Sequence, residues 1–268
     1  MKLKVILFGS TGMIGQGVLT ECLKDNRVEA VLVVNRQPSG VTHAKLKEII
    51  TFNMVNLVPI LDDLSGYNTC LFCLGISSAG MKEEEYNTIT YELTIHVATV
   101  LQNLNKDMTF CYVSGAGTDS TEKGSVMWAR VKGKTENALL NMPFKSAYMF
   151  RPGFIQPMNG EKSRTRLYNM LIPLFKPLYF FLKNFDSIVT NTETLGKAMI
   201  QVADKGYEKN ILESRDINAI VKQSLQDQQV FMLQGLSFEI AFFFAPSLLF
   251  AFNLKHIAFF FVISLKRV

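Results

Sequence analysis

The stretch that decides the fold runs from Lys4 to Gly15 and reads KVILFGSTGMIG. Its first half, Lys4–Gly9, is an apolar run of strand length, and Met13–Lys24 continues from its second half as a predicted helix. Three glycines stand between strand and helix in the spacing GxxGxxG. A helix N-terminus that a ligand can approach closely offers free N–H groups and the positive end of the helix dipole, which suit a phosphate group. The stretch therefore predicts a phosphate-binding loop that opens a strand–helix–strand unit.

Each glycine of this loop has its own expected task in holding a dinucleotide pyrophosphate. Gly9 permits the tight turn, Gly12 lacks the Cβ that would collide with the phosphates, and Gly15 lets helix and strand pack closely. The alternative is a helix entry that is glycine-rich for no functional reason. The loop residues expected to contact the cofactor are Gly9, Ser10, Thr11, Gly12, Met13 and Ile14.

After the loop, apolar runs of strand length alternate with longer, helix-like segments. This alternation predicts an α/β protein with a doubly wound parallel sheet of Rossmann type, covered by helices on both faces. We expect Pro152–Gly160 to be a loop and Thr190 or Thr192 to cap the last helix. The further expected strands are Val28–Asn35, Glu48–Met54, Asn68–Gly75, Thr109–Ser114, Ala147–Arg151 and Asn210–Glu213, and the further helices are Lys82–Leu104, Ser125–Leu140 and Thr192–Ala203.

The end of the second expected strand indicates which dinucleotide the loop would hold. An acidic side chain there would bind the adenosine ribose hydroxyls and repel a 2′-phosphate, but this chain has Asn35 followed by Arg36. A guanidinium offers a planar fork of donors suited to phosphate. We therefore expect NADP(H) as the cofactor, with NAD(H) as the alternative if Arg36 stacks on the adenine instead.

Composition argues against several other kinds of site. The formal net charge is +5 and the basic residues are spread along the chain, whereas a nucleic-acid partner needs them on one face or stripe. Cys70 and Cys73 form a CxxC, but an odd spacing within a strand puts side chains on opposite faces, so buried, unpaired cysteines are expected. The 3 histidines have no ligand-like spacing, and no metal site is expected.

Four shorter motifs accompany the glycine loop. They are Cys73-Leu74-Gly75, Val113-Ser114, Lys132-Gly133 with Glu136, and Phe150-Arg151-Pro152-Gly153. With these motifs, residues 3–218 resemble the short-chain dehydrogenase/reductase superfamily in its extended or atypical branch. Within that branch the chain looks most like the NAD(P)-binding epimerase-like proteins related to the Tat-interacting-protein oxidoreductase. The motifs are specific for the superfamily but not for a substrate.

The resemblance implies further cofactor contacts and two catalytic residues. Active members use a serine to polarise the substrate oxygen and a YxxxK pair, in which the lysine binds the nicotinamide ribose and lowers the pKa of the tyrosine. Ser114 matches the serine, and Lys132 matches the lysine, both as a catalytic residue and as a cofactor ligand. The other implied contacts are Asn53 to the adenine, Leu74 and Gly75 to the ribose, and Pro152, Gly153, Phe154 and Ile155 to the nicotinamide.

The tyrosine position departs from the superfamily pattern, because Trp128 stands there. Indole donates hydrogen bonds but has no acid–base chemistry near neutral pH, so the ordinary mechanism is expected to be badly weakened or absent. Tyr86, Tyr112 and Tyr148 are alternative phenols that no spacing places beside Lys132. Three functions stay open: an oxidoreductase on an unknown small carbonyl or sugar-like substrate, a non-catalytic NADPH-binding sensor or scaffold, and a membrane-tethered assembly factor.

The chain changes character after its cofactor domain. We expect an NAD(P)-binding domain over residues 1–220, with a small substrate-side region at about 154–190, and a hydrophobic C-terminal extension over residues 221–268. Ten of the 21 phenylalanines lie in Phe231–Val268. The uncharged stretch Ile240–Leu254 is shorter than the ~20 residues that span a bilayer. We expect membrane contact through an interfacial or re-entrant segment; the alternatives are a full span, a helix packed onto the body and a non-native C-terminus after a reading-frame change.

The N-terminus bears on location. Its apolar run, Val5–Phe8, is short of the roughly 7–15 apolar residues of a signal peptide. The body is therefore expected to be cytoplasmic, with membrane association through residues 231–268.

Overall fold

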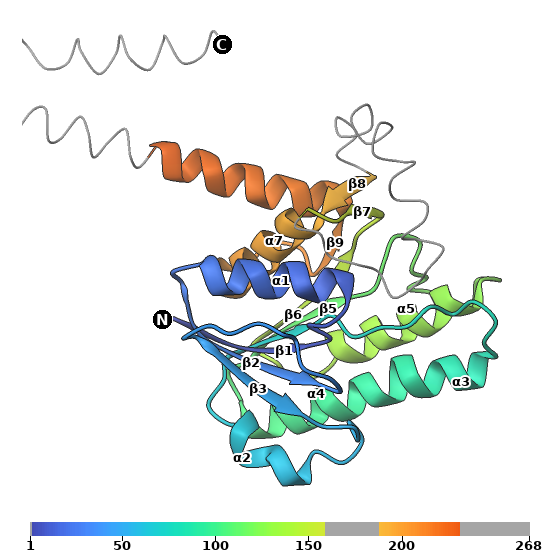
Figure 1. The fold of residues 1–268 in the computed structure, drawn as a ribbon. Coiled ribbons are helices and arrows are strands. Elements are labelled where there is room, and N and C mark those ends of the chain that lie inside the picture. Colours follow the sequence, from blue (N-terminus) through green and yellow to red (C-terminus); the bar gives the residue numbers. More distant parts are fainter. Residues whose placement is uncertain (1, 159–187, 231–268) are drawn as a thin grey trace, which may run out of the picture. The chain divides into compact units, whose positions relative to one another are not determined.

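The computed structural model describes residues 2–158 and 188–230 of the chain (Figure 1). The chain divides into two units, Met1–Lys222 and Gln223–Val268. The second unit is described over residues 223–230, which are helical. The predicted tail at 231–268 and most of the predicted substrate-side region at 154–190 lie outside the described residues.

A parallel sheet of seven strands forms the centre of the first unit, in the order β3-β2-β1-β4-β5-β6-β9. Every neighbouring pair in it is parallel. The chain leaves β1 towards β2 and β3, then returns to the other side of β1 for β4, so the sheet is doubly wound. The predicted fold class is confirmed. The strands are β1 (Leu3–Phe8), β2 (Val28–Asn35), β3 (Leu46–Ile50), β4 (Thr69–Phe72), β5 (Thr109–Val113), β6 (Ser146–Arg151) and β9 (Ile211–Glu213).

Helices cover both faces of this sheet because its strands are apolar on both sides. Leu7 packs into one core and the next residue, Phe8, into the other. Helices α1 (Met13–Lys24) and α7 (Thr192–Lys205) cover the first face (Figure 1). The opposite face carries α2 (Leu61–Leu64), α3 (Glu83–Asn87), α4 (Leu93–Leu104) and α5 (Met127–Leu140), with a 3-10 turn at Val58–Ile60 and a π-helical turn at Thr88–Glu92.

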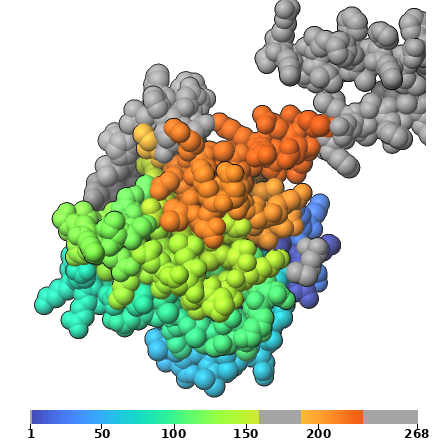
Figure 2. Space-filling view, turned by 180° about the vertical axis from the view of Figure 1, so that it is seen from behind, coloured from blue at the N-terminus to red at the C-terminus, as the bar shows by residue number. Residues whose placement is uncertain are grey.

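The loop after β1 belongs to the middle of the sheet, because β1 pairs with β2 on one side and with β4 on the other. In the space-filling view from behind, residues coloured from green through yellow-green to orange form much of the surface, and cyan and blue residues lie below them (Figure 2).

The third strand was expected at Glu48–Met54, and it ends earlier, at Ile50. Its last ladder bond runs from the Thr51 N–H to the Asn35 carbonyl at 2.8 Å. The side chain of Asn53 then accepts hydrogen bonds from the N–H groups of Val55 and Asn56, each at 3.1 Å. Asn53 thus makes a local turn that competes with the ladder, so it follows the strand and does not belong to it.

Two predictions about the segments that follow β6 were wrong. Pro152–Gly160, expected as a loop, contains the short strand β7 (Phe154–Gln156), which pairs with β8 (Val189–Asn191). A partner strand so distant in sequence leaves no local signal. The cap of α7 is Asn191 instead of a threonine, because its side chain accepts from the Thr194 N–H at 2.7 Å.

The cysteines of the CxxC lie on opposite faces, as predicted. Cys70 belongs to one core and Cys73 packs against the other. All four cysteines are free thiols.

Between residues 2 and 230, apart from the gap at 159–187, no helix combines the length and apolar character of a membrane span. Over the same residues no group of three His, Cys, Asp or Glu side chains could hold a metal ion.

Candidate functional site

The glycine loop lies between β1 and α1, and two of its three glycines are required by packing alone. Gly9 has φ +83°, and a Cβ there would lie 2.7 Å from the Leu74 nitrogen. A Cβ on Gly15 would lie 2.1 Å from the Gly9 carbonyl oxygen. At Gly12 the nearest such atom is 3.4 Å away, an ordinary contact. Packing within the protein therefore does not require glycine at position 12, where the motif expects a phosphate.

A cavity of about 310 Å³ opens at the carboxyl ends of the strands on both sides of the switch point between β1 and β4. Ligands of open α/β sheets bind at such a point. The N-terminus of α1 begins at its wall, so the cavity meets the positive end of a helix dipole. The predicted cofactor residues that line it are Gly9, Thr11, Gly12, Arg36, Asn53, Leu74 and Gly75.

Other lining residues were not predicted. Some could have been found as neighbours of predicted ones, since Phe52, Met54 and Val55 flank Asn53. Ile89 and Leu93 come from the π-helical turn and the start of α4, and no motif marked them. The remaining lining residues are Val34, Asn35, Cys73 and Ile76.

Three predicted loop residues do not line the cavity. Ser10 is 1% exposed, and its hydroxyl donates to the Asn35 side-chain oxygen at 3.0 Å. Met13 and Ile14 pack against the core under α1. Their side chains serve the fold, which leaves only their backbone groups to meet a ligand.

The predicted catalytic pair, Ser114 and Lys132, lies at the end of β5 and on α5. The Lys132 ammonium donates to the backbone carbonyl of Ser114. The Ser114 hydroxyl is turned inward, 2.5 Å from Glu136 Oε1 and 3.1 Å from the Phe150 carbonyl oxygen, and these two acceptors share its one proton. Ser114 is 5% exposed. The structure brings the two residues together, but it gives the hydroxyl that was expected to meet substrate two partners inside the protein.

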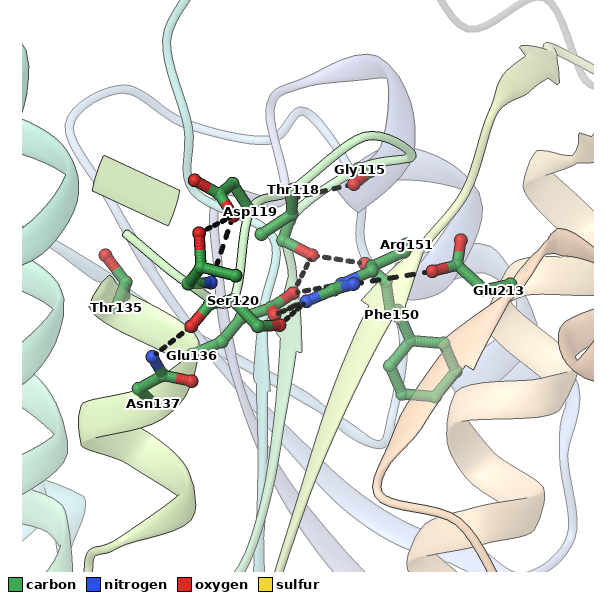
Figure 3. A network of polar contacts seen from close by, with 12 residues as sticks. Gly115, Thr118, Asp119, Ser120, Thr135, Glu136, Asn137, Phe150, Arg151 and Glu213 are labelled. Carbon is green, nitrogen blue, oxygen red and sulfur yellow. Dashed lines mark hydrogen bonds and ion pairs between the residues drawn. The ribbon is translucent and has the colours of Figure 1, made fainter. Parts of the chain in front are cut away.

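A buried ion pair underlies this region (Figure 3). Glu136, on α5, is fully buried and accepts from Arg151 of β6 at 2.5 Å. Arg151 reaches Glu213 at 3.5 Å with another nitrogen and donates to the Ser120 hydroxyl at 2.5 Å. The pair thus ties α5, β6, β9 and the loop after β5 into one network.

The loop after β5 lies directly on α5. A Cβ on Gly133 would lie 1.8 Å from the Asp119 carbonyl oxygen, so glycine is needed for this approach. Asn137 donates to the Ser120 carbonyl at 3.0 Å, and Asp119 N–H donates to the Ala129 carbonyl at 3.1 Å. The motif residues Gly133 and Glu136 therefore have a structural reason to be there.

Trp128 stands one turn before Lys132 on α5, is partly buried, and its ring would meet a Cβ on Gly117 at 3.6 Å. The three alternative phenols have other surroundings. Tyr112 and Tyr86 are buried, which raises the pKa of each phenol. The Tyr148 hydroxyl accepts from the Tyr207 N–H at 3.0 Å.

Burial sets the electrostatics of Lys132. Loss of water around the ammonium lowers its pKa from 10.5 to about 8, although the nearby Glu136 carboxylate opposes this shift. A lysine with such a pKa exchanges its proton near neutral pH.

The segment expected to hold the nicotinamide follows β6. The Pro152 carbonyl accepts from Ala116 N–H at 2.9 Å, which joins it to the loop after β5. Gly153 is packed so closely that a Cβ would lie 2.4 Å from the Ile188 carbonyl oxygen. Phe154 begins β7, and Ile155 is buried in the core beneath α7. None of these four residues lines the cavity described above.

The fold of the chain is similar to that of a short-chain dehydrogenase/reductase superfamily protein from Agrobacterium tumefaciens and of a UDP-N-acetylglucosamine 4-epimerase from Methanobrevibacter ruminantium, in agreement with the resemblance predicted from the motifs. Gre2 from Candida albicans, solved in complex with NADPH, aligns with TM-score 0.60 and 16% identity over 78% of this chain and 77% of that one. The Bordetella bronchiseptica enzyme WbmF, solved in complex with NAD+, aligns with TM-score 0.58 and 12% identity over 81% and 77%.

In sequence the chain is similar to fungal proteins named fmp52, mitochondrial. It is 27% identical to the one from Aspergillus niger over 174 residues, which are 60% of this chain and 69% of that protein. It is 24% identical to fmp52-1 from Aspergillus terreus over 221 residues, or 77% and 90%. No family model matches the chain. Those names place the relatives in mitochondria; a cytoplasmic location for this chain stays a prediction.

Proposed function

We propose that this chain binds NADP(H) in the cavity at the switch point of its sheet. The observation that carries the proposal is that seven residues, expected from separate motifs to contact a dinucleotide, line one cavity. They follow four different strands, β1, β2, β3 and β4, so their meeting is a property of the fold. Gre2 and WbmF, whose structures hold NADPH and NAD+, share this fold.

Each part of the cavity has its own task in this proposal. The pyrophosphate lies against Gly12 and the N-terminus of α1, where backbone N–H groups and the helix dipole favour an anion. The adenosine extends towards the ends of β2 and β3, where Asn53 and the exposed ring of Phe52 meet the base. Arg36, which is exposed at the cavity wall, pairs with the 2′-phosphate that distinguishes NADP from NAD.

We further propose that the bound dinucleotide is a ligand and is not turned over by tyrosine-dependent chemistry, as in a sensor or scaffold. Trp128 cannot donate or accept the proton that a tyrosine would move. The Ser114 hydroxyl is held by Glu136 and Phe150, which supports the same proposal. Lys132 then acts as a cofactor ligand.

One observation favours a second candidate, an oxidoreductase acting on a small carbonyl or sugar-like substrate. The pKa of Lys132 is lowered to about 8, so this ammonium could supply a proton near neutral pH. The candidate predicts that turnover, measured against a panel of carbonyl compounds with NADPH, falls as pH rises through about 8. A Lys132→Met variant without activity would agree with it; unchanged turnover in that variant would exclude it.

The binding proposal is tested with Trp128 as a built-in probe, since it is the chain's 1 tryptophan. Bound NADPH should quench the fluorescence of Trp128 and itself emit light by energy transfer from the tryptophan. Calorimetry on the same protein should give a saturable heat of binding. The Gly12→Val variant is the control without binding. The proposal is rejected if titration to about 1 mM NADPH gives neither binding heat nor energy transfer from Trp128. A Kd of about 1 mM corresponds to a binding free energy of only ~4 kcal/mol.

A further inference from the structure

A chain of hydrogen bonds joins the phosphate loop to the loop that carries Arg36. Its middle member is Asn35, the last residue of β2, which is 2% exposed. The Asn35 side-chain nitrogen donates to the Ser10 hydroxyl at 2.7 Å and to Glu48 Oε1 at 2.9 Å. Both of its protons are therefore used, and this amide has none left for a ribose hydroxyl.

The chain of bonds continues through Glu48, on the neighbouring strand β3. Its Oε1 also accepts from the Ser39 backbone N–H at 2.9 Å. Ser39 lies three residues after Arg36, in the segment that leads from β2 towards β3. One carboxylate oxygen thus holds the phosphate loop through Asn35 and Ser10, and holds the Arg36 segment directly.

The hydrogen bonds that Glu48 accepts are the strongest of this chain of bonds, because its carboxylate is charged. Hydrogen bonds to an ionised carboxylate are shorter and about twice as strong as those between neutral groups. The register of the sheet supports the placement, because Glu48 pairs with Val33, two residues before Asn35. Side chains two apart on a strand share a face, so both point towards the same side of the sheet.

We propose that Glu48 is a positioning residue that fixes the distance between the pyrophosphate site and the 2′-phosphate site. This proposal rests on the proposed function. It adds to the site a residue that does not itself touch the cofactor. NADP(H) bridges both sites, so it needs Gly12 and Arg36 in place together. NAD(H) uses only the first, so it depends less on Glu48.

The test compares three variants of the full chain in calorimetric titrations with NADPH and NADH. Glu48→Ala removes the acceptor and is expected to weaken NADPH about tenfold, as for one lost charge-assisted hydrogen bond, and NADH about threefold or less. Glu48→Gln keeps a carbonyl acceptor for both donors and is expected to stay within about threefold of the wild type for both cofactors. Glu29→Ala, an acidic residue of β2 at its other end, paired with Lys4 at 3.8 Å, is the matched control and should change neither.

A second readout needs no cofactor. In hydrogen exchange on the unliganded protein, Glu48→Ala should speed exchange in residues 36–40 and also in Ser10–Gly12, and Glu48→Gln should restore both. Faster exchange in residues 36–40 alone, or equal losses for NADPH and NADH, would overturn the proposal. If the wild type binds neither NADPH nor NADH, the proposed function is wrong. Faster exchange of both segments in Glu48→Ala would then show that Glu48 links the two loops for structural reasons alone.

Discussion

The two ends of the candidate site, one at the cavity and one at Ser114 and Lys132, differ in how their motif residues are used. At the end formed by β1, β2 and β4, the motif residues surround a cavity of about 310 Å³. At the end formed by β5 and β6, the motif residues hold one another. Ser114 bonds to Glu136, Lys132 bonds to the Ser114 carbonyl, and Glu136 pairs with Arg151.

This difference explains how a chain can keep a superfamily's motifs without its tyrosine. Gly133, Glu136 and Arg151 fix the loop after β5, so they are needed for folding whatever happens at the nicotinamide. A motif residue retained at that end is therefore weak evidence of catalysis. At the other end, Gly12 lines the cavity and, unlike Gly9 and Gly15, is not required there by packing.

The largest expected effect concerns the end formed by β5 and β6, where the motif residues bond to one another. Glu136→Ala should lower the free energy of unfolding by about 3–5 kcal/mol, because it leaves Arg151 without the partner of a buried ion pair. Denaturant unfolding measures this. Glu213→Ala removes the other, half-exposed carboxylate at 3.5 Å and should cost less than ~1 kcal/mol. Equal effects of the two substitutions would show that the buried Glu136–Arg151 pair is no more important to stability than the half-exposed Glu213.

At the cavity end, Gly12→Val should leave the fold intact and abolish dinucleotide binding, a loss of at least about a hundredfold, or ~2.7 kcal/mol. Packing within the protein does not require glycine at position 12, but the pyrophosphate would lie there. Gly15→Ala is the contrasting variant: its Cβ would lie 2.1 Å from the Gly9 carbonyl oxygen, so stability should suffer. Circular dichroism and calorimetry separate the two. Unchanged affinity in Gly12→Val would refute the placement of the pyrophosphate.

The choice of cofactor gives a smaller effect. Arg36→Ala should weaken NADP(H) by about 1–3 kcal/mol, the scale of a hydrogen bond to a charged group, and leave NAD(H) nearly unchanged. Titration with both cofactors measures the ratio. Equal losses would mean that Arg36 stacks on the adenine and does not read the 2′-phosphate.

The smallest effect is expected from repairing the tyrosine position. Trp128→Tyr restores a YxxxK, and turnover of a carbonyl substrate should rise by about tenfold, short of the 10²–10⁴-fold of full acid–base catalysis, since Ser114 stays engaged with Glu136. Steady-state NADPH consumption is the measurement. Ordinary turnover by the wild type would show that another residue supplies the proton.

Sequence patterns were sufficient for the sheet and for one end of the site. Buried strands such as Val28–Asn35 are long apolar runs, and the glycine spacing of Gly9–Gly15 has a direct backbone meaning. Both are local signals, so the doubly wound parallel sheet could be predicted from them, and so could the close packing at Gly9 and Gly15.

The remaining features depend on contacts between distant residues. β7 exists because it pairs with β8, which no pattern near Phe154 announces. The inward turn of the Ser114 hydroxyl depends on Glu136, 22 positions later, and the role of Glu48 depends on Asn35 across a strand pair. Such hydrogen-bond partners are brought together only when the chain folds. A sequence motif can therefore predict a functional residue but not the residue to which it bonds.

The two halves of the proposed cofactor are expected to bind this chain very differently. Calorimetry on the wild-type chain would compare 2′-phospho-ADP-ribose, which carries the adenosine and pyrophosphate parts, with nicotinamide mononucleotide. If the cavity end supplies the binding energy, as we propose, the first binds nearly as well as NADP(H) and the second shows no saturable heat up to about 1 mM. Measurable binding of the mononucleotide, or failure of 2′-phospho-ADP-ribose where NADPH binds, would contradict this proposal.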